Sequence, residues 1–203
     1  MGRDRRCRVC GRRHCGFLVF KVTRPLGRVG YRLANKTMLF KTDVMKNGFW
    51  LTLPPLLFSM SLMAAHPNAL TPAQFNEGIP AALLRIESIT RILVFAMPAF
   101  FSIGLTSSRQ KQGLVLYLAG VILYGLSYGI QNFSPHSQWS ICKLGFAASA
   151  YTNVFWMIGL SMLGEKFYFM ERLRYRPVFY VVPAVVFVAV HTTHAAVFHQ
   201  RIL

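Results

Sequence analysis

The chain has 203 residues, of which 54% are apolar and only 14% are charged, and its formal net charge at pH 7 is +17. Because the charged residues are concentrated outside a few long apolar runs, the composition is typical of a membrane protein and argues against a soluble globular domain. The positive charge follows the expected loops of such a protein, so we expect no nucleic-acid partner.

Residues 1–44 form a basic segment that we expect to be disordered or non-native. The segment holds four side chains of the kinds that bind zinc, namely Cys7, Cys10, His14 and Cys15. Structural zinc sites normally combine two half-sites separated by a folded loop, whereas these four residues fall within a stretch of nine. A targeting peptide is a further alternative, because the segment is rich in arginine, although it contains no serine.

A second possible translation start is Met45, where a short cationic stretch runs directly into apolar sequence. Residues 1–44 carry twelve basic and two acidic residues, so a chain that starts at Met45 has a net charge of +7. We therefore treat residues 45–203 as the domain in which the fold and any site are to be found.

Apolar windows after residue 45 predict about five transmembrane helices, at residues 49–65, 89–105, 113–133, 144–163 and 178–199. The expected fold class is therefore an all-α integral membrane bundle. Pro54 and Pro55 lie in the middle of the first window and predict a kink or a break there. If that window is instead a cleaved signal peptide, four spans remain.

Small residues in the third and fourth windows predict close helix packing. The third window places Ala119, Gly120, Gly125 and Gly129 where neighbouring helices can approach. The fourth window is rich in alanine, serine and glycine, which suits a helix that packs against others on several sides. We therefore expect the fourth helix to be central.

The distribution of lysine and arginine predicts the orientation. With five spans, nineteen basic residues fall on one side and four on the other, namely Arg85, Arg91, Lys143 and Arg201. Basic residues accumulate in cytoplasmic loops, so we expect the N-terminus inside and the C-terminus outside, in a membrane such as the bacterial inner membrane. The basic loop around Tyr168 and Tyr175 is expected to contact anionic lipid.

Most polar residues of the apolar region map to the expected external side. Five of the six histidines do so, namely His66, His136, His191, His194 and His199, and they are the candidate metal ligands. Gln131 and Asn132 lie at the same level, and Asn153 lies nearer the middle of the membrane. A metal or haem protein is therefore one functional alternative, with His66 or His136 as the partner of a histidine from the last span.

Two local patterns place side chains on shared helix faces. Glu87 and Arg91 are spaced i, i+4, and His191 and His194 are spaced i, i+3. Ionisable groups in a span usually face the bundle interior or water, so we expect these four residues to converge in one outward-opening pocket. The simpler interpretation is that they mark the membrane boundary as exposed polar tips.

A further alternative is enzymatic. The segments "ESITR", residues 87–91, and "FVAVH", residues 187–191, resemble the Glu-x-x-x-Arg and Phe-x-x-x-His elements of the glutamate- and histidine-dependent membrane endopeptidases that include prenyl-protein processing enzymes. The resemblance implies that Glu87 activates water and that His191 binds or polarises the substrate carbonyl. The chain has one glutamate where that family has a pair, and it lacks the later His-x-x-x-Asn element. The leading expectation remains a small polytopic membrane protein with a structural, accessory or transport-associated role, which packs with lipid or with other membrane proteins.

Overall fold

The computed structural model describes residues 45–65, 72–169 and 173–202 of the chain. The expectations for residues 1–44, including the zinc ligands and the position of the translation start, lie outside this described part, and so does His66. All statements below concern the described residues, which belong to the compact unit Leu39–Leu203.

The described residues are mostly helical. In chain order they form η1 (Gly48–Thr52), α2 (Leu53–Ala65), α3 (Pro72–Asn76), α4 (Ala81–Ala96), η2 (Met97–Phe100), β1 (Phe101–Ile103), α5 (Ser108–Phe133), α6 (Gln138–Ile141), α7 (Lys143–Phe146), α8 (Ala148–Tyr151), α9 (Asn153–Leu163), β2 (Gly164–Phe167) and α10 (Val178–Ile202). The elements labelled η are short 3-10 helices. This confirms the expectation of a helical protein, although β1 and β2 were not predicted.

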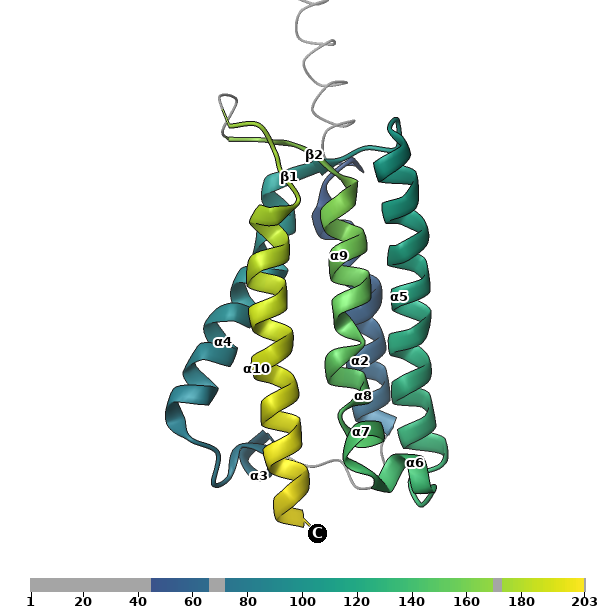
Figure 1. The fold of residues 1–203 in the computed structure, drawn as a ribbon, viewed down its shortest axis with the longest axis vertical. Helices are drawn as coiled ribbons and strands as arrows, with labels where there is room; N and C mark the ends of the chain where they lie inside the picture. Colours follow the sequence, from purple (N-terminus) through teal and green to yellow (C-terminus); the bar gives the residue numbers. More distant parts are fainter. Residues whose placement is uncertain (1–44, 66–71, 170–172, 203) are drawn as a thin grey trace, which may run out of the picture. The chain divides into compact units, whose positions relative to one another are not determined.

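Helix α9 lies at the centre of the helical bundle, as predicted for the fourth apolar window. It packs between α5 and α10, while α4 packs on the other side of α10 and α2 packs on α5 (Figure 1). Trp156, Met157, Leu160 and Leu163 of α9 are fully buried and form the middle of the hydrophobic core. Two aromatic side chains pack against these residues, Tyr117 from α5 and Tyr180 from α10.

Glycines bring α5 and α9 into direct backbone contact. A Cβ atom added at Gly120 would lie 2.3 Å from the backbone nitrogen of Trp156, and one added at Gly159 would lie 2.3 Å from that of Tyr117. Neither contact is sterically allowed, so any larger residue at these positions has to push the helices apart. By contrast, a Cβ atom at Gly129 would meet nothing within 4 Å, so this glycine does not serve the packing that the sequence predicted for it.

The first apolar window is divided at its prolines, for which a kink or a break was expected. Pro54 and Pro55 lie in the first turn of α2, which begins at Leu53, and η1 precedes it. Proline is tolerated in the first turn of a helix because the N–H group that it lacks has no helical partner there. The two prolines therefore mark the start of a helix and do not kink one.

The second window, residues 89–105, does not form one helix. Helix α4 starts earlier, after Pro80, and ends at Ala96. Pro98 lacks the N–H group that would bond the carbonyl of Val94 in a continuing helix, and the hydroxyl of Tyr180 donates to this carbonyl instead, at 3.2 Å. The chain then continues as η2 and β1, and β1 pairs with β2 in an antiparallel two-stranded sheet.

The fourth window, residues 144–163, is divided into α7, α8 and α9. The interruption frees backbone carbonyls that a continuous helix would have used. The side-chain amide of Gln131 donates to the carbonyls of Gly145 and Phe146, at 2.8 and 2.6 Å. A side chain from α5 thus stabilises the break, which the composition of the window does not indicate.

The third and fifth windows are confirmed as long helices. Among the described residues, only α5 and α10 are long and apolar enough to cross a membrane by length and composition, a criterion that core helices of soluble proteins also meet. In α5 and α10, however, only 28% and 33% of the most apolar window is buried inside the protein. A core helix would be mostly buried, so these two helices are weak support for a membrane protein.

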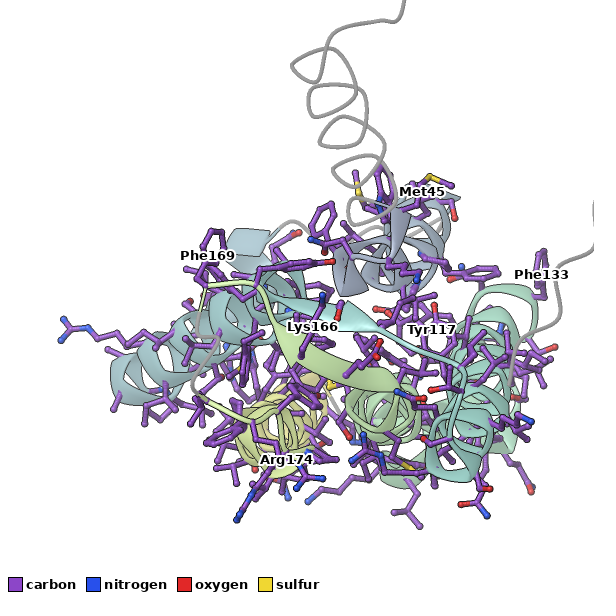
Figure 2. All side chains as sticks on the ribbon, turned by 90° about the horizontal axis from the view of Figure 1, so that it is seen from above. Met45, Tyr117, Phe133, Lys166, Phe169 and Arg174 are labelled. Carbon is purple, nitrogen blue, oxygen red and sulfur yellow. The ribbon has the colours of Figure 1, made fainter. Side chains whose placement is uncertain are left out.

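Charge separates the two ends of the described part. Six basic residues lie at the end that carries β1 and β2, namely Lys46, Arg109, Lys111, Lys166, Arg174 and Arg176, and two of these, Lys166 and Arg174, are labelled in Figure 2. The other end, where α10 terminates (Figure 1), carries Arg85, Lys143 and Arg201, and Arg91, the fourth basic residue expected on that side, lies further along α4. The described basic residues are therefore unequally distributed along the helix axes, and the orientation in a membrane stays a prediction.

Large apolar side chains cover the outside of the helices. The exposed ones include Leu57 and Met60 of α2, Ile89 and Ile92 of α4, Val115, Ile122 and Phe133 of α5, and Val182 and Val185 of α10. Phe133 projects away from the other helices (Figure 2). Soluble monomers rarely expose apolar surface this extensive and continuous.

Candidate functional site

The four predicted polar residues are in contact, with Glu87 at their centre, while the outward-opening pocket expected around them stays a prediction. Glu87 points from α4 towards α10, where its Oε1 lies 3.0 Å from Nδ1 of His191 and its Oε2 lies 2.5 Å from Nδ1 of His194. Arg91, one turn further along α4, donates from its Nη2 to the same Oε1. We call these four residues the Glu87 cluster.

Local helix geometry explains why the four side chains meet. Residues spaced i, i+3 or i, i+4 share a helix face, so α4 presents Glu87 and Arg91 together, and α10 presents both histidines. Phe187 extends the face of α10, and its ring stacks on His191 with centroids 5.3 Å apart. Packing of α4 against α10 then brings the two faces into contact.

Phe75 of α3 is a fifth member of the site, which sequence reasoning missed. Its backbone carbonyl lies 3.2 Å from Nε2 of His194, and its ring lies 4.4 Å from the imidazole. A carbonyl can only accept, so Nε2 of His194 carries a hydrogen and donates it. The contact is made by a backbone group, which every residue has, so no side-chain pattern could have indicated it.

These contacts fix the charge of the Glu87 cluster. If Glu87 is ionised, His194 donates from both ring nitrogens and is an imidazolium; if Glu87 holds the proton instead, His194 is neutral. In both cases Glu87 and His194 sum to zero. Arg91 adds one positive charge, so Glu87, Arg91 and His194 together carry a net charge of +1.

Exposure is graded across the cluster. The side chains of Glu87 and His194 are 3% and 2% exposed, that of His191 is 21% exposed, and that of Arg91 is 51% exposed. The carboxylate and one histidine are thus buried, while the guanidinium and the other histidine reach the surface.

The remaining described histidines do not join this site. His199 donates from Nε2 to the backbone carbonyl of Ile141, at 2.7 Å, and its ring packs on Phe146. His136 is exposed in the turn between α5 and α6. No group of three or more His, Cys, Asp or Glu in the described part of the chain is arranged to hold a metal ion.

Other polar residues of the expected constellation have structural partners elsewhere. Asn153 accepts a hydrogen bond from the indole N–H of Trp156, at 2.7 Å, within α9. Gln131 stabilises the break in the fourth window, as described above. The Glu87 cluster is therefore smaller than the set of residues that sequence reasoning collected.

The two residues singled out by the resemblance to membrane endopeptidases are in contact, since His191 lies 3.0 Å from the carboxylate of Glu87. A general base, however, needs an acceptor position that is open to water. Arg91 and His191 bind Oε1 of Glu87 and His194 binds Oε2, which uses three of about four acceptor positions, and the side chain is buried. The geometry is that of a shared carboxylate held between donors.

Comparison with known proteins gives no further guide, since no protein family, no curated protein and no solved structure matches this chain. The function has to be argued from the chemistry of the Glu87 cluster and from the surface of the helices.

Proposed function

We propose that this chain is a small polytopic integral membrane protein with a structural, accessory or transport-associated role. Its basic end faces the cytoplasm and its C-terminus faces the outside, as in a bacterial inner-membrane protein. The observation that carries this proposal is the distribution of polarity: apolar side chains cover the outside of the helices, while Glu87, Asn153 and His194 are buried between them.

Energetics support a lipid environment for this surface. Exposed Ile, Leu, Val and Phe side chains gain about 1.5–3 kcal/mol each when they leave water, so a surface made of them favours burial in hydrocarbon. In lipid, every polar backbone group needs an internal partner, and helices supply these partners along their whole length. The basic residues gather where β1 and β2 lie, at the end where a strand edge can meet water or headgroups.

The Glu87 cluster fits this proposal as a link between helices. Ionisable groups at membrane depth are stable only when they are paired or wet, and the cluster pairs α4 with α10. The metal and haem alternative has less support, since the nitrogens of His194 and Nε2 of His199 already bind protein groups. The peptidase alternative has less support because three of about four acceptor positions on the buried carboxylate of Glu87 are occupied.

The test is membrane integration and orientation. The full chain should stay with the membrane fraction after extraction at alkaline pH, which releases peripheral proteins. Alkaline phosphatase, which is active only outside the cytoplasm, should be active when fused after Leu203 and inactive when inserted after the exposed residue Phe169. An insertion at Ser107 would be a poorer choice, because Ser107 and Gln110 form the capping box of α5.

Release of the chain at alkaline pH contradicts the proposal as a whole. Active phosphatase at both positions, or the reverse pattern, contradicts the orientation while leaving membrane integration intact.

A further inference from the structure

The positive charge of the Glu87 cluster lacks a counter-charge in the described part of the chain. The carboxylate of Glu87 is divided among Arg91, His191 and His194, and no other described carboxylate forms an ion pair with Arg91. A half-exposed guanidinium at membrane depth is costly unless an anion or water covers it. All three neighbours of Glu87 in the cluster therefore bind its carboxylate, whereas one positive charge of the cluster has no counter-charge among the described residues.

Two donors of the cluster stand side by side at the surface. Arg91 and His191 both bind Oε1 of Glu87, so their side chains flank a single oxygen atom, and both are partly exposed. The guanidinium of Arg91 has five N–H groups, of which one is used in its bond to Glu87. The remaining groups can bind a second oxyanion.

The surface beside these donors is partly apolar. Leu84 and Phe95 share the helix face of Arg91 and are half-buried, and Ile92 is exposed next to this face. Exposed Ser88 is the polar residue on the same face. A small hydrated anion gains nothing from such a surface, whereas an amphiphile can place its charged headgroup on Arg91 and its hydrocarbon chain along α4.

We propose that Arg91 binds the oxyanion headgroup, a phosphate or carboxylate, of a membrane amphiphile whose chain lies along the apolar part of the same face of α4. Glu87 holds Arg91 next to His191 and competes with the ligand for the guanidinium. Arginine suits this task since its planar fork matches carboxylate and phosphate oxygens. The inference rests on the proposed function, because it needs α4 to face lipid.

The test is a lipid titration of the full chain in mild detergent, with phosphatidylglycerol as the anionic amphiphile and phosphatidylcholine as the reference of zero net charge. Bound lipid is counted by native mass spectrometry. We expect one phosphatidylglycerol to bind in preference to phosphatidylcholine. Arg91→Gln should lower this affinity by about tenfold or more, the usual effect of losing a hydrogen bond between charged groups.

Two variants make the result specific. Arg85→Gln removes the same kind of exposed side chain from the same helix, outside the cluster, and should change the affinity by less than about twofold, as expected for a distant screened charge. Glu87→Gln removes the carboxylate that competes for Arg91, so binding should become tighter. Because Arg91→Gln and Glu87→Gln act in opposite directions, general destabilisation cannot produce both results.

Equal effects of Arg85→Gln and Arg91→Gln would overturn the inference, as would weaker binding in Glu87→Gln. If inorganic phosphate displaces phosphatidylglycerol at equal concentration, the site binds a free anion, and the proposal of an amphiphilic ligand is overturned. A chain that integrates into membranes but shows no preference for phosphatidylglycerol refutes this inference alone, whereas release at alkaline pH refutes the proposed function.

Discussion

Replacing Glu87 by alanine should destabilise the protein more than any change at its other described acidic residues. Removing one partner of a buried ion pair costs about 3–5 kcal/mol, because it leaves the other partner buried without compensation. Here that partner is His194, which is 2% exposed. Arg91 is half-exposed and can be hydrated after the change, so its pair with Glu87 adds only about 0–1 kcal/mol. We therefore expect a loss of about 3–5 kcal/mol.

The assay is unfolding of the purified chain in mild detergent, followed by circular dichroism as the temperature or the sodium dodecyl sulfate content is raised. Glu165→Ala is the matched control, since Glu165 is exposed on β2 and forms no ion pair with a described residue. Its free energy of unfolding should stay within about 0.5 kcal/mol of wild type, as for most surface changes.

A double-mutant cycle separates the interaction from general damage. Glu87→Leu and His194→Phe each leave a buried polar partner alone, whereas the double variant removes both partners together. Replacing both members of a buried pair by apolar groups is often close to neutral. The double variant should therefore be more stable than the sum of the two single losses predicts, by about 2 kcal/mol. Additive losses, or a Glu87→Ala variant as stable as Glu165→Ala, would refute the buried pair.

Two further predictions concern packing and the first 44 residues. Gly120→Ala should destabilise the bundle by about 1–3 kcal/mol in the same unfolding assay, because the new Cβ atom meets the backbone of α9. Gly129→Ala should instead stabilise α5 by about 0.5–1 kcal/mol, because its Cβ atom meets no other group. Equal effects of the two changes would contradict the close contact between α5 and α9. Deleting residues 2–44 should leave membrane insertion unchanged in the alkaline extraction assay, and loss of insertion would favour a targeting or zinc-binding role for this segment.

The sequence predicted those parts of the site that depend on local spacing. Glu87 and Arg91, like His191 and His194, are neighbours on their own helices, so their pairing needs only the helical period. The contact between the two pairs could also be predicted, because ionisable groups in an apolar surrounding are stable only when they are paired or hydrated. The backbone carbonyl of Phe75 was not foreseeable, since it depends on where α3 lies and on no side-chain property.

The limits of the fold prediction have a similar origin. Hydropathy detects how apolar a segment is and does not distinguish a helix from a short buried strand, so β1 was read as the end of a span. Proline was interpreted correctly as a helix breaker, but its position decides the outcome: Pro54 and Pro55 start α2, whereas Pro98 follows the end of α4. The breaks around α7 and α8 depend on Gln131 of another helix, which no window within 144–163 contains.

The unequal lengths of α4 and α5 have a consequence for the surrounding lipid. Helix α5 has 26 residues and is about 39 Å long at 1.5 Å per residue, whereas α4 has 16 residues and is about 24 Å long. A hydrocarbon core of about 30 Å is too thin for the first helix and too thick for the second. Such hydrophobic mismatch tilts the longer helix and thins the bilayer next to the shorter one. In the membrane integration that we propose, the leaflets are drawn together beside α4, and the headgroup layer comes closer to the charged side chains in the middle of that helix.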